Sequence, residues 1–342
     1  MKIAIGMDIG GTETKFVLAS EKGKVLSSHT IATPSSSDKE KDREPKKIEE
    51  LLVMSLREFL DSDASRAVLS RSPGKQEVAG IGIGVAGLID RNNGNVIQSP
   101  NIPALNNVPL REIFEKEFSM PVVIENDANV YAFGEKWIGA GRDLSSFLVL
   151  TLGTGLGGGL IYKDELYEGP VEVGHMSVVP SGRYCPCGSY GCLESYASGR
   201  ALVDRVISSL EKGTESLLSK LCDGNFYRIT PKMIYQAALD GDNLSREVFR
   251  ESGQFLGIGV ASLINVLDLE AVIIGGGLVG AWDLIIGEVG QEVSKRAFKP
   301  LSAKVKILKS GLTNDAGALG AAGFLLSKIS SSRSGDPSSR TS

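Results

Sequence analysis

The sequence predicts an α/β protein built from two related halves. An apolar strand, a glycine turn and a second strand open the chain over residues 2–20, and the same pattern returns over residues 147–166. Elsewhere strands alternate with helical segments. A mixture of strands and helices with a motif repeated near the middle is typical of two α/β units that face one cleft. A chance likeness between the two short segments is the alternative interpretation.

Each element of the first half is predicted from its local pattern. Residues 2–9 form an apolar run that indicates a strand, and residues 15–20 form another beyond the glycine turn. Residues 34–47 are polar and charged, which predicts a loop. We then expect a helix over 48–62, a loop over 63–76, a buried strand over 78–90, a strand over 120–127 and a helix over 128–141.

The second half is expected to begin with the two strands that flank the repeated glycine turn. A third glycine turn follows a strand near residue 274 and leads towards a helix. Residues 329–342 are rich in serine and poor in apolar side chains, which predicts a disordered tail.

The composition excludes several classes of protein. The 342 residues carry a formal net charge of −4, so no overall basic field points to nucleic acid or an anionic membrane as a partner. The apolar run at the N-terminus is too short for a signal peptide, and no apolar stretch reaches the roughly 18 residues of a membrane span. Four cysteines do not make a secreted disulfide scaffold. We therefore expect a reduced, cytoplasmic protein.

The glycine turns are candidate phosphate sites, because backbone N–H groups without a neighbouring Cβ can approach phosphate oxygens closely. Ordinary hairpin turns are the alternative for any one of them, but two turns that carry hydroxyls, together with a third glycine turn, favour phosphate. Asp8 could hold hydrated Mg²⁺. The candidate residues are Gly10, Gly11, Thr12, Thr14 and Lys15 in the first turn, Gly153, Thr154 and Gly155 in the second, and Gly275, Gly276 and Gly277 in the third.

Several motifs together resemble one known family. The first turn, "DIGGT", is similar to the first phosphate motif of the sugar kinase, Hsp70 and actin superfamily. The motifs "GVAGLID", "ENDAN", "LGTGLGGG", "EVGHMSVVP" and "CPCGSYGCLE" resemble those of the ROK family (repressors, open reading frames and kinases), from about residue 3 to 325. The stretch "CGSYGCLESYASGRAL" is most like bacterial ROK glucokinases. ROK repressors carry an additional N-terminal helix-turn-helix, for which the residues before Asp8 leave no room.

The resemblance implies an actin-like (ribonuclease H-like) ATPase fold with two lobes and a cleft between them. It implies a homodimer whose substrates are ATP and a sugar, with the γ-phosphoryl group passing to the 6-hydroxyl of a hexose, glucose above all. The phosphates would meet the first and second turns, and the nucleoside the third. The expected divisions are a smaller lobe of residues 1–127 plus 314–328, a larger lobe of 128–313, and the tail.

Three of the four cysteines lie within eight residues and predict a metal site. Cys185, Cys187 and Cys192 supply three thiolates, and tetrahedral zinc needs a fourth ligand. His175, ten residues earlier, is close enough to complete a structural Cys3His site, as the family resemblance also implies. A disulfide between Cys187 and Cys192 is the alternative, and it leaves Cys185 without a role.

Two glutamates flank the predicted metal site. Glu172 precedes His175 by three residues and Glu194 follows Cys192 by two, so folding around zinc would fix both carboxylates as acceptors for sugar hydroxyls. A solvated surface charge is the alternative for each glutamate alone. The resemblance implies that both glutamates and His175 contact the sugar.

Asp127 is the predicted catalytic base. It lies at the junction between a buried strand and a helix, where α/β proteins place ligands, and its carboxylate could accept the proton of an attacking hydroxyl. A helix N-cap is the alternative role, and Glu125 is the less favoured base because its side chain alternates to the other side of the strand. The resemblance assigns Asn126, Gly87 and Asn101 to the sugar, although the tryptophan of the family's sugar loop is missing beyond Asn101.

Two rival functions stay open. One is a kinase for another sugar, such as N-acetylmannosamine, N-acetylglucosamine, fructose or mannose. The other is a sugar-sensing regulator without turnover. The sequence does not decide between ATP and polyphosphate as the phosphoryl donor.

Overall fold

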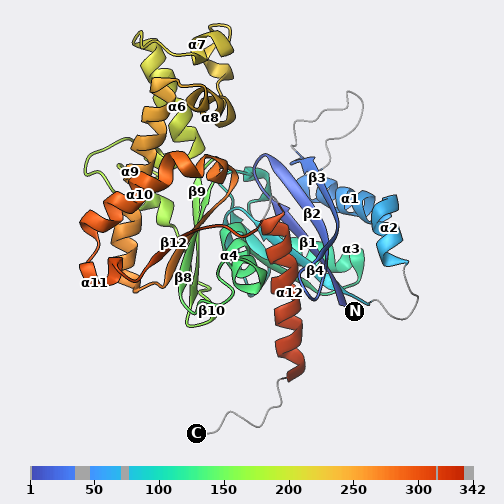
Figure 1. Ribbon diagram of the computed structural model, residues 1–342. Helices are drawn as coiled ribbons and strands as arrows, with labels where there is room; N and C mark the ends of the chain where they lie inside the picture. The colour runs from blue at the N-terminus through green and yellow to red at the C-terminus, as the bar shows by residue number, and fades with distance from the viewer. Residues whose placement is uncertain (1, 35–46, 71–76, 313–314, 335–342) are drawn as a thin grey trace. The chain divides into compact units, whose positions relative to one another are not determined.

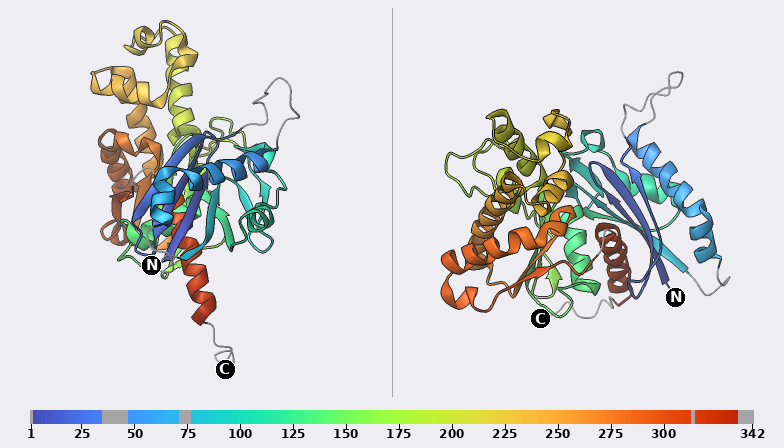
Figure 2. Two further views of the ribbon diagram at one scale, coloured as in Figure 1. Left: turned by 90° about the vertical axis from the view of Figure 1, so that its right-hand side faces the viewer. Right: turned by 45° about the horizontal axis from the view of Figure 1, so that its top comes forward.

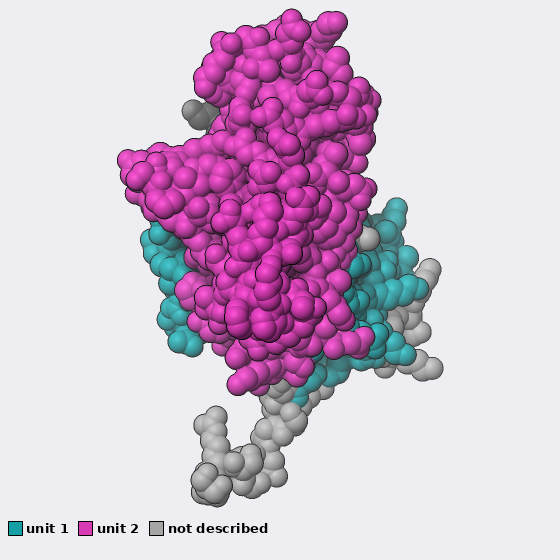
Figure 3. All heavy atoms as spheres, turned by 60° about the vertical axis from the view of Figure 1, so that its left-hand side comes forward, with its two compact units in different colours: residues 1–142, 311–342 teal, residues 143–310 magenta. Residues whose placement is uncertain are grey.

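The computed structural model describes residues 2–34, 47–70, 77–312 and 315–334 (Figure 1). The chain divides into two compact units, coloured separately in Figure 3. Unit 1 comprises Met1–Arg142 and Gly311–Ser342, and unit 2 comprises Asp143–Ser310. Each unit is built around one five-stranded sheet.

The sheet of unit 1 has the order β3-β2-β1-β4-β7. Its first three strands form an antiparallel meander, whereas β4 runs parallel to β1 and β7 parallel to β4. The bounds are β1 Lys2–Ile9, β2 Glu13–Ser20, β3 Val25–Ala32, β4 Glu77–Val85 and β7 Val122–Asn126. A separate two-stranded ribbon is formed by β5 (Leu88–Asp90) and β6 (Asn95–Gln98), with a short helix η1 (Pro103–Leu105) after it.

The two faces of this sheet differ because side chains alternate along a strand. Ile3, Ile5 and Met7 of β1 join a large apolar core that also contains side chains of α1 (Ile48–Asp61) and α3 (Leu110–Phe118). Ala4 joins a second cluster, with α12 (Ala316–Ser334). Helix α12 lies across this face of the sheet (Figure 2). Asp8 is in phase with Ala4, so its carboxylate belongs to the same face.

Glycines let α12 approach that face closely. A Cβ placed on Gly6 would lie 1.9 Å from the carbonyl oxygen of Ala318, and one on Gly82 would lie 1.9 Å from that of Ala321. No real Cβ tolerates such distances, so the helix backbone rests directly on β1 and β4. The alternation of glycine and isoleucine in "GIGIG" of β4 thus serves both faces: isoleucines fill the core beside α1 and glycines admit α12.

Three expectations for unit 1 need correction. The first part of the loop expected over 63–76 forms α2 (Asp63–Leu69), whose N-cap Ser62 accepts a hydrogen bond from the N–H of Ser65, and residues 71–76 lie outside the described residues. Helix α4 (Asp127–Ile138), which the sequence assigned to the other lobe, packs against α12 and lies in unit 1, whose first segment runs to Arg142. The expected tail is helical up to Ser334, because α12 continues beyond residue 328.

Some expectations fall outside the described residues. Most of the charged loop predicted over 34–47 lies there, as do residues 335–342 of the predicted tail. Within the described residues, the strand β3 was not predicted.

Unit 2 repeats the topology of unit 1. Its sheet has the order β10-β9-β8-β11-β12, in which β8, β9 and β10 form an antiparallel meander and β11 and β12 run parallel to β8. This is the same order and direction as in the first sheet, so the predicted repeat is real. The bounds are β8 Phe147–Leu152, β9 Leu156–Tyr162, β10 Glu165–Leu166, β11 Ala271–Gly275 and β12 Lys306–Lys309.

The helices of unit 2 bury one continuous apolar core against this sheet. Its longest helix, α9, packs along α10. The bounds are η2 Val173–His175, α5 Glu194–Ala197, α6 Gly199–Glu211, α7 Leu218–Leu221, η3 Phe226–Arg228, α8 Pro231–Leu239, α9 Asn243–Leu267, η4 Gly277–Ala281, α10 Trp282–Arg296 and α11 Lys299–Ser302. Of the helices that the structure describes, none combines the length and the apolar character needed to cross a bilayer.

Candidate active site

Asp8 and Asp127 lie near each other at the carboxyl-terminal end of the parallel strands in unit 1. Asp8, near the end of β1, lies opposite Gly84 of β4, and Asp127 begins α4 directly after β7. A Cβ placed on Gly84 would lie 3.8 Å from Oδ1 of Asp8 and 3.7 Å from Cα of Asp127. The carboxyl ends of parallel strands are where α/β proteins bind ligands. The structure therefore places the predicted base and the predicted Mg²⁺ ligand in one region.

The environment of Asp8 favours a bound cation. The pKa of Asp8 is raised from 3.8 to about 7, chiefly by burial and next by the negative charge of Asp127, while Lys15 lowers it. The start of α12 covers the carboxylate, since a Cβ on Gly317 would lie 2.2 Å from Oδ2. Burial makes the ionised form of such a carboxyl group unfavourable, and a divalent cation beside it would stabilise that ionised form.

The first glycine turn leaves its backbone exposed. The N–H of Gly10 donates to the carbonyl of Glu13 at 3.0 Å, and Gly11 and Thr12 are exposed. Thr14, in contrast to the exposed Gly11 and Thr12, is fully buried, and its Oγ1 lies 3.0 Å from Oγ1 of Thr33.

Thr33 supports this turn and was missed by the sequence reasoning. Its hydroxyl donates to the carbonyl of Gly10 at 2.6 Å, so the Thr14 hydroxyl is left as the donor towards Thr33. The N–H of Thr33 also donates to the carbonyl of Thr12 at 2.9 Å. No local motif marks Thr33, because its role depends on the pairing of β2 with β3.

Asn126 is the N-cap of α4. Its Oδ1 accepts from the N–H of Ala128 at 3.0 Å and from that of Asn129 at 3.2 Å. The Asp127 carboxylate also accepts from the N–H of Ala128, at 2.9 Å, but the capping position itself belongs to Asn126. The N-cap of α4 is therefore Asn126 and not Asp127, contrary to the alternative role considered for Asp127.

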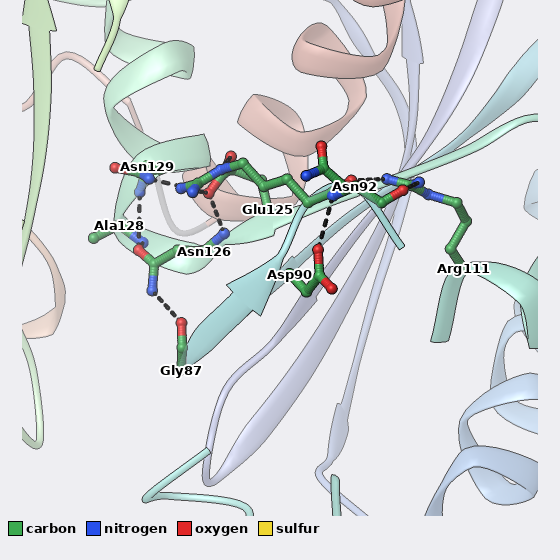
Figure 4. A network of polar contacts seen from close by, with 9 residues as sticks. Gly87, Asp90, Asn92, Arg111, Glu125, Asn126, Ala128 and Asn129 are labelled. Atoms are coloured by element: carbon green, nitrogen blue, oxygen red, sulfur yellow. Dashed lines mark hydrogen bonds and ion pairs between the residues drawn. The ribbon is translucent and has the colours of Figure 1, made fainter. Parts of the chain in front are cut away.

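The other sugar candidates of unit 1 lie around this junction. The carbonyl of Gly87 accepts a hydrogen bond from Nδ2 of Asn126 at 3.0 Å (Figure 4). The exposed Asn101 lies against the first glycine turn, since a Cβ on Gly11 would lie 3.1 Å from the Cβ of Asn101. The structure thus gathers Gly87, Asn101 and Asn126 near the turn and the two carboxylates.

The second and third glycine turns lie side by side in unit 2. Gly275, at the end of β11, pairs with Thr151 of β8, just before Gly153. Gly276 has a φ of +85°, and a Cβ there would lie 2.5 Å from the carbonyl oxygen of Leu152, so only glycine fits. The two turns therefore present their backbones at the same edge of the second sheet.

Helix α6 fixes the second turn. The carbonyl of Gly153 accepts from the N–H of Gly199 at 2.8 Å, and the N–H of Gly153 donates to the carbonyl of Gly155 at 3.0 Å. Thr154 is exposed between them.

Glu194 also contacts the second turn. One of its carboxylate oxygens accepts from the N–H of Leu156 at 2.7 Å, and a Cβ on Gly155 would lie 2.5 Å from the same oxygen. The glutamate is partly buried at the start of α5, two residues after Cys192. A carboxylate expected to bind sugar is therefore attached to a turn expected to bind phosphate.

The histidine and three cysteines converge, as predicted. The ligand atoms of His175, Cys185, Cys187 and Cys192 all lie within 4.8 Å of one another. Sγ of Cys187 and Sγ of Cys192 are 3.7 Å apart, and Nδ1 of His175 lies 3.7 Å from Sγ of Cys185. A zinc–sulfur bond of about 2.3 Å gives a tetrahedral edge of about 3.8 Å, so these spacings fit zinc. They exceed the roughly 2.05 Å of a disulfide bond, and all four cysteines are free.

His175 links this cluster to Glu172. The ring turns Nδ1 to the cysteines, while Nε2 lies 3.9 Å from a carboxylate oxygen of Glu172. Both side chains are exposed, at 38% for His175 and 66% for Glu172. One nitrogen can therefore bind a metal while the other stays accessible to a ligand near Glu172.

The motifs and the fold have a common explanation in one family. The model of the ROK family matches residues 4–328. The chain belongs to the ROK family. Among curated ROK-family relatives it is 35% identical to the glucokinase of Thermotoga maritima, over 95% of this chain and 98% of that protein. It is 34% identical to the glucokinase of Streptomyces coelicolor, over 94% and 97%.

Solved ROK structures share the fold. A ROK glucokinase of Streptomyces griseus, in complex with glucose and AMPPNP, is 34% identical with a TM-score of 0.76, over 94% of this chain and 98% of that one. A ROK transcriptional regulator superposes with a TM-score of 0.79 at 26% identity, over 96% of this chain and 81% of that one. The predicted family and its actin-like α/β fold are confirmed.

Proposed function

We propose that this ROK protein is a glucokinase that transfers the γ-phosphoryl group of ATP to the 6-hydroxyl of glucose. The observation that carries the proposal is the pair Asp8 and Asp127 beside an exposed glycine turn, in a chain about 35% identical to glucokinases over nearly its whole length. A sugar kinase needs both a base for the hydroxyl and a charged region for the phosphates.

The reaction assigns a separate task to each carboxylate. The sugar 6-oxygen forms a bond to the γ-phosphorus, and the bond from that phosphorus to the β–γ bridging oxygen breaks, which releases ADP. Asp127 accepts the proton of the hydroxyl. Mg²⁺, held in its hydrated form near Asp8, would neutralise charge on the phosphates. With a pKa of about 7, Asp8 is only partly ionised near neutral pH in the free protein, and a bound cation would stabilise its ionised form.

The phosphate contacts come chiefly from backbone N–H groups. In unit 1 we assign them to Gly11 and Thr12, with Lys15 as the cation. Gly10 shapes the turn, since its own N–H donates to the carbonyl of Glu13. Thr14 acts indirectly, through its hydrogen bond to Thr33. In unit 2 we assign phosphate contacts to Thr154 and Gly155. Gly153 shapes that turn, since its N–H donates to the carbonyl of Gly155. The nucleoside is assigned to Gly275, Gly276 and Gly277.

The sugar contacts are assigned to side chains with unused hydrogen-bonding capacity. Two helix N–H groups occupy Oδ1 of Asn126, and one hydrogen of its amide group donates to the carbonyl of Gly87. The second amide hydrogen is left for a sugar hydroxyl. Glu172 is an exposed acceptor beside Nε2 of His175. Gly87, Asn101 and Glu194 complete the assignment.

Zinc has a structural role in this proposal. His175, Cys185, Cys187 and Cys192 would bind it as a closed tetrahedral set, which leaves no position for a metal-bound water. Zinc would hold the segment that contains Glu172 and the one that contains Glu194, and so order two sugar acceptors.

A coupled assay of ADP release tests the proposal. We expect glucose-dependent turnover with Mg-ATP, at least about a hundredfold slower in Asp127→Asn, and a lower kcat/KM for mannose, fructose, N-acetylglucosamine and N-acetylmannosamine. The same panel with polyphosphate in place of ATP identifies the donor. Turnover highest with another sugar would reassign the substrate, and no turnover with any sugar would overturn the kinase.

A sugar-sensing regulator is the second candidate. The chain is 33% identical to a xylose repressor of Caldicellulosiruptor bescii, over 95% of this chain and 78% of that protein. Sugar binding by calorimetry without any ADP release would favour this role.

A further inference from the structure

A fully buried carboxylate lies next to the proposed base. Glu125, the penultimate residue of β7, is 0% exposed and is bound by four N–H groups (Figure 4). Nε of Arg91 donates to Oε2 at 2.5 Å, and Nη2 of Arg91 donates to Oε1 at 2.7 Å. Oε1 also accepts from the N–H of Asn126 at 2.7 Å and from Nδ2 of Asn129 at 3.0 Å. Glu125 therefore accepts three hydrogen bonds at Oε1 and one at Oε2, all of them from groups of the protein.

These bonds and the complete burial exclude Glu125 as the base. Its carboxylate oxygens are bound by Arg91 and by residues at the junction between β7 and α4, and none of its surface is exposed to a substrate. Glu125 instead binds residues on both sides of Asp127, through the backbone N–H of Asn126 and the side-chain amide of Asn129.

Arg91 is itself held from the opposite side. Its carbonyl accepts from Nη2 of Arg111 at 2.7 Å, and the carbonyl of Asn92 accepts from Nη1 of Arg111 at 2.9 Å. Oδ1 of Asp90 accepts from the N–H of Asn92 at 3.0 Å and closes the turn. Arg111 lies on α3, so the turn that carries Arg91 is anchored between α3 and β7.

Three hydrogen bonds therefore attach residues 87–91 to the strand–helix junction at Asn126 and Asp127. Two belong to the bidentate pair Arg91–Glu125, and the third runs from Nδ2 of Asn126 to the carbonyl of Gly87. We propose that Arg91 and Glu125 are positioning residues, which hold Asn126 and Asp127 at the angle needed to receive the sugar hydroxyl. The inference rests on the proposed function, and neither residue is expected to contact the sugar.

The expected effect is on turnover. A misplacement of about 1 Å at a reacting group can lower a rate about a hundredfold. We expect Arg91→Met and Glu125→Gln to lower kcat about tenfold to a hundredfold, with the KM for ATP changed less than about threefold. Arg91→Lys keeps the charge but loses the planar two-point contact, so its kcat should lie between those of wild type and Arg91→Met.

A matched variant separates positioning from stability. Arg296 donates from Nε to the buried Glu292 at 2.6 Å in α10 of unit 2, so Arg296→Met also removes an arginine from a buried glutamate. We expect Arg91→Met and Arg296→Met both to lower Tm, and only Arg91→Met to lower kcat per folded molecule, measured at 20 °C with folding monitored by circular dichroism.

The outcomes are distinguishable. If the wild type phosphorylates glucose and the kcat values of Arg91→Met and Glu125→Gln stay within about twofold of the wild-type value, the positioning role is overturned and the proposed function stands. Equal loss of kcat in Arg296→Met would assign the effect to stability and also overturn it. Absence of sugar phosphorylation in the wild type would refute the proposed function, and this inference with it.

Discussion

Glu194 accepts a hydrogen bond from the N–H of Leu156 at 2.7 Å. The bond joins Glu194, two residues after the last cysteine of the cluster, to Leu156, the residue that follows the second glycine turn. Sequence reasoning placed Glu194 with the sugar alone. The structure shows that the same carboxylate also fixes a turn assigned to phosphate.

Variants of the two glutamates should therefore differ. We expect Glu194→Ala to raise the KM of both glucose and ATP, because it removes a sugar acceptor and releases the N–H of Leu156. Glu172→Ala should raise only the KM of glucose, since that side chain is 66% exposed and 3.9 Å from Nε2 of His175. Loss of one charge-assisted hydrogen bond is worth about 1.5–3 kcal/mol, or about tenfold to a hundredfold in KM. Steady-state kinetics with each substrate varied in turn measures the split, and equal effects from both variants would contradict it.

Purified protein should contain about one zinc per chain. Cys187→Ser should lose the metal and raise the KM of glucose more than that of ATP, because the segments with Glu172 and Glu194 lose their common anchor. Cys222→Ala is the matched control: Cys222 is buried in unit 2 and lies outside the cluster, so zinc should be retained. Elemental analysis by mass spectrometry is the measurement. Full glucose affinity in a zinc-free protein would refute the structural role.

Asp127→Asn should lower kcat about a hundredfold to ten-thousandfold, because an amide cannot accept the hydroxyl proton. Since Asn126 occupies the capping position of α4, Tm should change little. Rapid-mixing kinetics, together with calorimetry of glucose binding, separate turnover from affinity. A variant with more than about a tenth of the wild-type kcat would exclude Asp127 as the base.

The stability of the protein should depend on pH through Asp8. Its pKa is about 7 in the folded state against 3.8 in the unfolded chain, so the folded state holds the extra proton between these values. Stability from this group is therefore present below pH 4, falls as pH rises, and is lost above pH 7. Asp8→Asn should raise Tm at pH 8 and have little electrostatic effect at pH 4. Calorimetric scans across this range test the sign, and a larger gain at pH 4 would contradict it. Added Mg²⁺ should restore part of the Tm that the wild type loses at high pH, and it should have no such effect on Asp8→Asn.

The elements with strong patterns were predictable from sequence. The strand–turn–strand motifs at 2–20 and 147–166 follow from apolar runs interrupted by glycine, and the two sheets with equal topology confirm the repeat. The short helix α2 was missed because its segment is mostly polar and serine-rich. Helix α4 was assigned to the wrong side of the boundary because packing against α12, a segment about 180 residues later, decides its unit.

Residue types at short, fixed spacing were enough to predict the family, the glycine turns, the cysteine–histidine set and the position of Asp127 at a strand–helix junction. Which polar groups already have partners within the protein became clear only from the folded structure. Thr14 is buried against Thr33, Asn126 caps α4, and the buried Glu125 forms a bidentate pair with Arg91. These partners lie 19 and 34 residues apart for Thr14–Thr33 and Arg91–Glu125. Such pairings depend on strand register and on how loops pack, and no local pattern in the chain encodes them.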